Sequence, residues 1–310
     1  MIVKTQFTPA SMWPYARFEL GLAAISSVAA WALVSRFGIH QVALPATLAT
    51  VLGTALSILL AVRVNTAYQR WWEASGCWAQ ILGASRTLVR VAVAVTDAKH
   101  QPAEATQAFQ QDVARRQVAY LTALRLQLRR QLDTPEGRAE LASHLSAEEN
   151  AALAGADNPA MLLLERQSAR IFDAFGEGLL AGFDNFQMEV ALAAISIQQA
   201  LAERIAMQPT PRTYDVFSRY LVHIYVVVFP FAVISALTRD HWLVIPATLV
   251  IGYAFRMIER IGAVVEAPFA AVVHDVPLTA ITTTAQRDLA ELVGQGHRPP
   301  APHPVGGYLW

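Results

Sequence analysis

The hydrophobic positions of this chain gather near its two ends, and the polar positions gather between them. Near the start, residues 20–35 and 41–62 form two runs without a charged residue, separated by a short break at Phe37-Gly38-Ile39. Near the other end, the uncharged runs 220–237 and 242–255 flank a short polar turn. A helix needs about 20 apolar residues to cross a bilayer. We therefore predict four membrane helices in two hairpins. The fourth is short, and its assignment to the membrane depends on its pairing with the third.

The charged residues define the remaining layout. Of the 48 charged residues, 33 lie between residues 63 and 219, where Ala- and Leu-rich runs such as 104–132 favour helices. The last residues are rich in Pro and Gly, so we expect an extended tail that is mobile or lies across a neighbour. The predicted organisation is residues 1–62 with membrane helices one and two, 63–219 as a cytosolic helical region, 220–255 with membrane helices three and four, 256–293 as cytosolic C-terminal helices, and 294–310 as the tail.

The positive charges predict the orientation of these helices. An even number of crossings places both termini and the polar middle on one side, and the side richer in Lys and Arg is cytoplasmic. That side carries Lys4, Arg17, Arg63, Arg70, Arg204, Arg212, Arg219, Arg256 and Arg260, against Arg36 and Arg239 on the other. Aromatic residues typical of the headgroup layer stand at the predicted boundaries: Trp13, Tyr15, Trp71, Trp72, Tyr220 and Trp242.

The composition excludes several functional classes. Hydrophobic residues make up 54% of the chain and charged residues 15%, against about 25% charged residues in ordinary soluble domains. The formal net charge is zero, which argues against a nucleic-acid partner. No two of the eight histidines are three or four residues apart, and no phosphate-binding loop or nucleophile elbow occurs. We therefore expect a membrane protein that is not an enzyme, with no metal site and no cofactor.

One face of the second predicted helix carries a regular stripe. Thr54, Ile58 and Val62 are spaced by four residues and so lie nearly on one face. If copies of this helix surround an axis, the stripe becomes three stacked rings, two of them apolar, which can gate ions by dewetting. Ordinary packing inside one protomer is the alternative. Beside the stripe, Gly53 begins a ridge of small residues that lets another helix approach closely.

The residues that follow this helix point to a protein family. The run Arg63-Val64-Asn65-Thr66-Ala67-Tyr68-Gln69-Arg70-Trp71-Trp72-Glu73-Ala74 resembles the signature after the second membrane helix of bestrophins, particularly of their bacterial branch. Further matches follow in the same order: Arg115-Arg116-Gln117, Glu203-Arg204-Ile205, Pro209-Thr210-Pro211, Phe229-Pro230-Phe231, Glu266-Ala267-Pro268-Phe269 and His274-Asp275-Val276-Pro277-Leu278. The resemblance covers about residues 15–293 and rests on the ordered set rather than on any single match.

The resemblance implies a homopentameric ion channel in a bacterial inner membrane, with one axial pore and a hydrophobic neck on the second helix. Carried over by position, the neck falls on Thr54, Ile58 and Val62. The family usually has three bulky apolar residues there, so we expect a wider or wetter neck here. A second, cytosolic constriction is also implied, and Phe183 and Phe186 are the nearest candidates, with core packing as the alternative.

The resemblance also bears on the ion and on partners. Bacterial members resemble cation-conducting pores, so the first hypothesis is a channel for sodium or potassium. An anion (chloride) channel of the same fold is the second. A membrane scaffold that recruits a cytosolic protein partner of unknown identity, without physiological flux, is the third. Eukaryotic members bind calcium through an acidic run after the Pro-Phe motif, where this chain has only Asp275, so we expect no such site.

Charged residues next to the predicted neck have two interpretations. Arg63 either sets the electrostatic potential at the inner pore mouth or has a structural role, paired with Glu73 or Glu266. The segment 256–266 places its charged residues opposite apolar ones, and we expect its polar side to be a solvated face.

Overall fold

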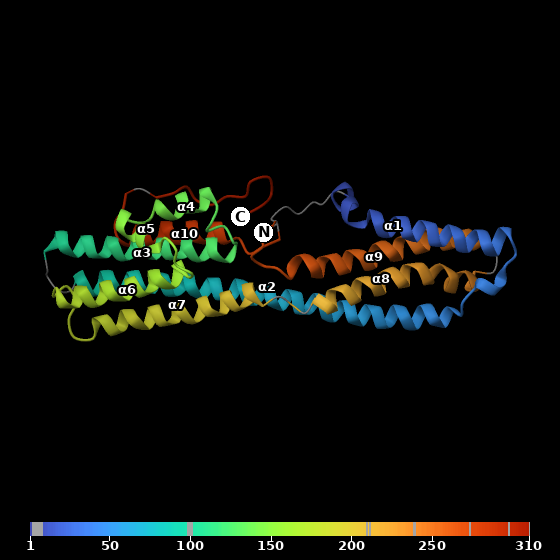
Figure 1. The fold of residues 1–310 in the computed structure, drawn as a ribbon, viewed down its shortest axis with the longest axis horizontal. Coiled ribbons are helices and arrows are strands. Elements are labelled where there is room, and N and C mark those ends of the chain that lie inside the picture. The colour runs from blue at the N-terminus through green and yellow to red at the C-terminus, as the bar shows by residue number, and fades with distance from the viewer. Residues whose placement is uncertain are drawn as a thin grey trace. The chain divides into compact units, whose positions relative to one another are not determined.

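Helices make up the fold in the part of the chain that the structure describes (Figure 1). The computed structural model describes residues 1, 9–97, 102–208, 210, 212–237, 240–272, 274–296 and 298–309. Its helices are α1 (Pro9–Trp31), α2 (Ala46–Asp97), α3 (Ala103–Leu128), α4 (Pro135–Ala142), α5 (Ala147–Leu153), α6 (Pro159–Gly176), α7 (Asp184–Met207), α8 (Arg212–Val233), α9 (Val244–Val265) and α10 (Leu278–Leu292). Within these ranges the one β-type pairing is an isolated bridge between Val305 and Tyr308, so the all-helical prediction is confirmed for them.

The apolar runs of the sequence predict where the long apolar helices lie, but they do not predict where these helices end. The first break is where the sequence predicts it, because Gly38 adopts a left-handed φ of 68° just after the turn that follows α1. Helix α2, however, does not end with its apolar run at Val62 but continues to Asp97. Charged and polar residues such as Arg70 and Glu73 end a hydrophobic run, yet they are good helix formers.

Five helical segments of the described chain are long and apolar enough to cross a membrane. They are residues 13–36, 40–97, 184–207, 213–236 and 241–265. Four of them cover the four predicted spans, except for Leu237 at the end of the third span. The additional one is α7, which the sequence analysis placed in the cytosolic region.

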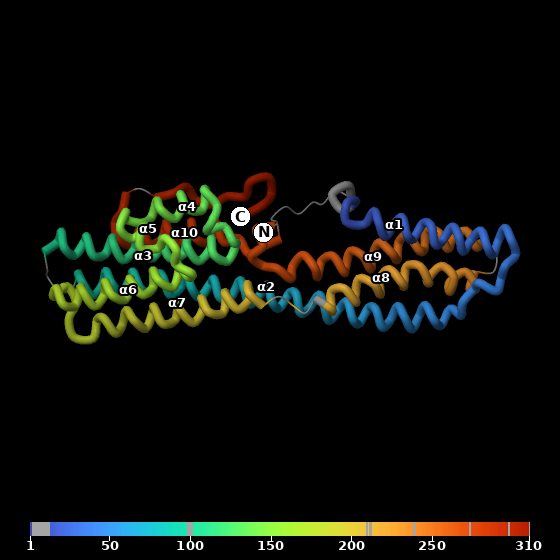
Figure 2. The backbone as a smooth tube through the Cα atoms, viewed as in Figure 1, coloured from blue at the N-terminus to red at the C-terminus, as the bar shows by residue number. Residues whose placement is uncertain are grey.

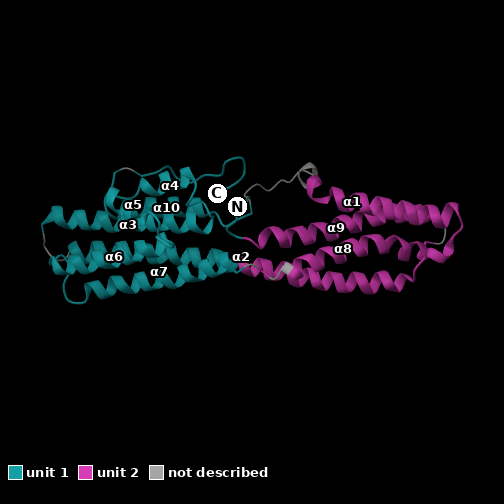
Figure 3. Cartoon of the chain, viewed as in Figure 1, with its two compact units in different colours: residues 1–3, 72–208, 268–310 teal, residues 4–71, 209–267 magenta. Residues whose placement is uncertain are grey.

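The chain forms two compact units, coloured in Figure 3. Unit 1 comprises residues 1–3, 72–208 and 268–310, and unit 2 comprises residues 4–71 and 209–267. Helix α2 contributes its first part to unit 2 and its second part to unit 1. Lys4 and Arg239, which the orientation prediction counts, lie outside the described residues, as does the side chain of Arg212.

Unit 2 is built from close contacts between α1, α8, α9 and the first part of α2. A Cβ atom on Gly252 of α9 would lie 3.4 Å from a methyl group of Val226 and 3.5 Å from the Cβ atom of Ala23. A Cβ atom on Gly53 of α2 would lie 2.7 Å from the hydroxyl oxygen of Tyr225. Glycine at position 252 therefore lets α9 pack closely on α8 and α1, and glycine at position 53 leaves room for the side chain of Tyr225 against α2.

Helix α8 tolerates an internal proline because another helix supplies a hydrogen bond. Pro230 has no N–H, so it cannot bond to the carbonyl of Val226 four residues earlier. The hydroxyl of Ser26 on α1 lies 3.3 Å from that carbonyl oxygen and donates to it. An unsatisfied carbonyl costs several kcal/mol in an apolar environment, so this contact ties α1 to α8 at the proline.

Unit 1 centres on α3, whose side chains are mostly buried. Helices α6 and α10 pack on α3, and α7 packs on α6 and α3. The C-terminal tail follows α10 as an extended segment, drawn in dark red in Figure 2. Arg298 of the tail pairs with Glu291 of α10 at 2.8 Å, so the described tail lies on its own chain.

Candidate functional site

The three predicted neck positions share an exposed face of α2. Thr54 is exposed, and the exposed fractions of Ile58 and Val62 are 62% and 51%. The opposite face of the same helix is buried through Leu56 and Leu60, which contact the core of unit 2. The stripe therefore lies outside the core of its own protomer. It is an apolar surface with one hydroxyl-bearing residue, available to lipid or to further copies of the chain.

The hydroxyl groups along this part of α2 are turned onto their own backbone. Thr54 donates to the carbonyl of Thr50 at 2.8 Å, Ser57 to that of Gly53 at 2.7 Å, and Thr66 to that of Val62 at 3.0 Å. A hydroxyl that donates four residues back keeps only oxygen lone pairs for other partners. Thr54 therefore offers an acceptor and a methyl group on the exposed face, but no free donor.

Arg63 follows the stripe but points into unit 2. Its side chain is 5% exposed, and its guanidinium lies 3.0 Å from Glu259 of α9 and 2.8 Å from the hydroxyl of Ser218 of α8. It also pairs with Asp215, and with Glu266 at 3.7 Å. Glu259 itself is 2% exposed. The structural role proposed for Arg63 fits this geometry, because a buried guanidinium with these partners anchors α2 to α8 and α9.

The ion pairs continue from this anchor to α1. Arg256 contacts the second carboxylate oxygen of Glu259 at 2.6 Å and a carboxylate oxygen of Glu19 at 3.1 Å. His223 lies 3.2 Å from the same oxygen of Glu19. Buried charges are tolerated only when they are paired. This network of ion pairs therefore holds α1, α2, α8 and α9 against one another. The expectation of a solvated polar face over 256–266 is wrong at Glu259, because that carboxylate packs inward onto Arg63.

The two acidic partners considered for Arg63 lie in different places. Glu266 is near Arg63, and burial raises its pKa against the opposing attraction of the guanidinium. Glu73 belongs to unit 1 and pairs with Arg204 of α7 at 2.5 Å. Sequence reasoning missed Asp215, Ser218 and Glu259. The signal available for them was their position at the ends of the third and fourth apolar runs.

The candidates for a second constriction stand at the start of α7. Phe183 is 77% exposed, its ring centroid lies 6.2 Å from that of Phe186, and Phe186 is also exposed. Asp184 accepts a hydrogen bond from the backbone N–H of Ala181 at 2.9 Å, which stabilises the turn before them. Neither phenylalanine is part of the core of unit 1, so core packing within the protomer does not account for them.

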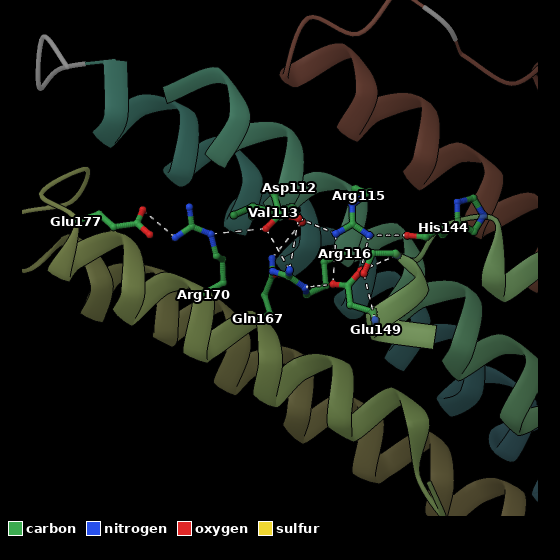
Figure 4. Close-up of polar contacts among 10 residues, drawn as sticks. Asp112, Val113, Arg115, Arg116, His144, Glu149, Gln167, Arg170 and Glu177 are labelled. Atoms are coloured by element: carbon green, nitrogen blue, oxygen red, sulfur yellow. Dashed lines mark hydrogen bonds and ion pairs between the residues drawn. The ribbon is translucent and has the colours of Figure 1, made fainter. Parts of the chain in front are cut away.

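The two arginines of the Arg115-Arg116-Gln117 motif anchor unit 1 through a charge network that Figure 4 shows. Glu149 of α5 accepts from Arg115 at 2.8 Å and from Arg116 at 2.9 Å, both on α3. The backbone N–H of Ser146 donates to the same carboxylate at 2.9 Å. Burial alone raises the pKa of Glu149, but the bonds from Arg115, Ser146 and Arg116 outweigh it and lower this pKa to about 2.

The lowered pKa predicts a loss of stability in acid. A carboxylate with a depressed folded pKa stabilises the fold above its unfolded pKa of 4.5 and loses that contribution as the pH falls toward about 2. We expect Glu149→Gln to lower stability by about 1–3 kcal/mol at neutral pH. Thermal unfolding in mild detergent should show that the difference in stability between wild type and Glu149→Gln decreases as the pH falls from about 4.5 to 2. The exposed neighbour Glu148→Gln serves as control, and an equal pH profile for both variants would contradict the assignment.

Fold and site together define a class: an all-helical membrane protein with an exposed, uncharged stripe on a long helix and a buried charge network behind it. A family model described as bacterial/fungal bestrophin protein matches residues 15–291. The chain therefore belongs to the bacterial and fungal bestrophin family, which confirms the resemblance seen in the sequence. Proteins of this kind are channels rather than enzymes.

Named relatives and solved structures agree with this family. The chain is 28% identical over 251 residues to the voltage-dependent anion channel-forming protein YneE of Escherichia coli K12, covering 81% of this chain and 77% of the relative. It is 27% identical over 263 residues to a Synechocystis protein of the same description, covering 84% and 81%. A crystal structure of a bacterial bestrophin homologue from Klebsiella pneumoniae matches with a TM-score of 0.79 at 26% identity, covering 91% of this chain and 99% of that one.

Proposed function

We propose that this protein is an ion channel in which the exposed face of α2 lines an axial pore. The observation that carries the proposal is the uncharged stripe Thr54, Ile58 and Val62, exposed in the protomer while the opposite face of α2 is buried. Rings of Ile58 and Val62 around an axis would form a neck that gates by dewetting. Family membership supports five copies around that axis, and Phe183 or Phe186 is the proposed second constriction.

The proposed arrangement in the membrane uses four spans. They are α1, the first part of α2, α8 and α9, all of which belong to unit 2. We place α7 in the cytosolic region although it is long and apolar, because it packs on α6 and α3 within unit 1. The charge distribution along the sequence supports a bacterial inner membrane protein with both termini in the cytoplasm.

The ion class favoured by the relatives is anionic. The curated relatives are named as voltage-dependent anion channel-forming proteins, which supports the anion hypothesis over the cation hypothesis. We therefore propose that the channel passes small monovalent anions such as chloride. Cation conduction is the second candidate, because Thr54 presents oxygen lone pairs without a free donor on the exposed face.

Reversal potential decides the ion class. A tenfold NaCl gradient across a planar bilayer sets the sodium and chloride equilibrium potentials about 59 mV on either side of zero. We expect purified wild-type protein to reverse near the chloride potential. Reversal near the sodium potential would establish the cation channel instead. An intact oligomer that carries no current, together with a stoichiometric cytosolic partner in a pulldown, would support the scaffold hypothesis.

A further inference from the structure

The arginines near the predicted membrane boundary of unit 2 differ in their partners. Arg63 and Arg256 are bound within the buried network described above. Arg219 pairs with Asp215 one helical turn away at 2.7 Å. Arg260 is the exception on α9, because it makes no ion pair among the described residues. A guanidinium without a carboxylate at a membrane boundary calls for another anion.

Arg260 is nevertheless held in a defined position. Its guanidinium carbon lies 4.9 Å from the centroid of the Tyr15 ring on α1, which is a cation–π contact. Its Nε atom is buried and has no hydrogen-bond partner among the residues that the structure describes. The backbone carbonyl of Tyr15 accepts from Arg256 at 3.1 Å, so this helix end is fixed from two sides. The stacked guanidinium is therefore preorganised, with one buried donor unsatisfied.

The carboxylates of the neighbouring network are already engaged. Glu19 and Glu259 both pair with Arg256, which lies one turn before Arg260 on the same helix. Two cations thus flank Tyr15, and only Arg256 is neutralised. Arg260 is therefore the cation beside Tyr15 that no carboxylate of the described residues contacts.

The helices that hold Arg260 and Tyr15 also present apolar side chains. Phe18 and Ile25 follow Tyr15 on the same side of α1 and are exposed. Tyr253 lies two turns before Arg260 on α9 and is exposed as well. An unpaired cation at one end of exposed apolar stripes matches a molecule with an anionic head and hydrocarbon chains.

We propose that Arg260 and Tyr15 form a binding site for the headgroup of an anionic phospholipid, with the acyl chains along α1 and α9. Arg256 contributes positive charge but keeps its carboxylate partners. The guanidinium supplies paired donors to the phosphate, and the tyrosine ring fixes its orientation. The inference rests on the membrane placement in the proposed function but not on ion conduction, so a failure of either can be recognised separately.

Lipid binding to the purified full-length protein tests this site. Dissociation constants for phosphatidylglycerol, phosphatidylcholine and inorganic phosphate are measured in mild detergent by native mass spectrometry or by ligand-induced thermal shift. We expect wild-type protein to prefer phosphatidylglycerol, with no effect of inorganic phosphate. Arg260→Gln should weaken phosphatidylglycerol binding by about fivefold or more. Tyr15→Leu replaces the aromatic ring with an aliphatic side chain and keeps both arginines. It should also weaken the binding of phosphatidylglycerol.

Arg17→Gln is the matched control. Arg17 is an exposed arginine at the same end of α1 and makes no ion pair among the described residues. Unlike Arg260, it stacks on no aromatic ring of those residues, and it lies on another side of the helix from Tyr15. We expect its substitution to leave the preference for phosphatidylglycerol intact. Equal weakening by Arg17→Gln and Arg260→Gln would overturn the site in favour of general charge attraction. Equal binding of both lipids, a response to inorganic phosphate alone, or loss of the oligomer in Arg260→Gln would also overturn it. If Arg260→Gln fails to fold, Tyr15→Leu and Arg260→Lys decide.

Discussion

Arg63→Ala is expected to prevent stable folding of unit 2. The change removes the guanidinium that joins Glu259, Asp215 and Ser218, and it leaves the carboxylate of Glu259 buried at 2% exposure. Removing one partner of a buried ion pair costs up to about 3–5 kcal/mol. Arg256 still pairs with the second carboxylate oxygen of Glu259, but the oxygen that faced Arg63 and the hydroxyl of Ser218 lose the guanidinium that donated to them. That cost is a large part of the stability of an ordinary domain. Size-exclusion profiles and thermal midpoints in mild detergent should show little monodisperse protein.

Two further variants separate this effect from a general loss of charge. Arg219→Ala removes an exposed arginine whose partner lies one helical turn away, and such pairs contribute about 0.3–0.5 kcal/mol. Adding Glu259→Gln to Arg63→Ala neutralises the buried carboxylate that has lost one of its two arginine partners, and it should recover part of the lost stability. The anchor role would be refuted if Arg63→Ala proved as stable as Arg219→Ala.

Ile58→Ala is expected to raise the current through the channel. In the proposed assembly every copy contributes one Ile58 side chain to the middle ring of the neck. One substitution therefore shortens the side chain in every copy and widens the ring. A fall of about 1.4 kcal/mol in the dewetting barrier corresponds to a tenfold increase in rate. Single-channel recordings should show a higher conductance or open probability. Thr54→Ile, which restores an apolar ring, should change the current in the opposite direction.

Ile224→Ala provides the matched control for the neck. Ile224 lies on α8, is exposed in the protomer like Ile58, and undergoes the same chemical change. Its substitution should leave the current unchanged. Equal currents from wild type, Ile58→Ala and Thr54→Ile in intact oligomers would remove α2 from the pore lining. The reversal potential would then still report on the ion class.

The spacing of hydrophobic residues predicts the helices of this fold better than it predicts their ends. The uncharged runs near both ends of the chain overlap α1, α2, α8 and α9, but each run extends beyond one end of its helix by two to five residues. The run that ends at Val62 does not reveal that α2 continues to Asp97, because the polar residues that follow are good helix formers. The composition of α7 also resembles that of a membrane helix, and its packing in unit 1 depends on contacts that the sequence does not display.

The candidate site, too, is predicted by the sequence only in part. The helical period alone brings Thr54, Ile58 and Val62 to one face, and the structure leaves that face exposed. The partners of Arg63 are different, because Glu259 lies 196 residues away and meets it only when α9 packs on α2. Glu73 is ten residues further along the same helix, a rise of about 15 Å, which is too far for a direct ion pair.

The bond between Ser26 and Val226 bears on how the protein enters the membrane. The two residues are separated by 200 positions, so α1 leaves the ribosome long before α8. In the folded protein the hydroxyl of Ser26 also lies 3.2 Å from the carbonyl oxygen of Ala23, so it has an acceptor on its own helix before α8 is present. When α8 is inserted, the carbonyl of Val226 lacks its usual donor because of Pro230, and Ser26 meets that need once the two helices are adjacent. In the proposed four-span arrangement, we therefore expect the second hairpin to pack stably only against a first hairpin that is already in place.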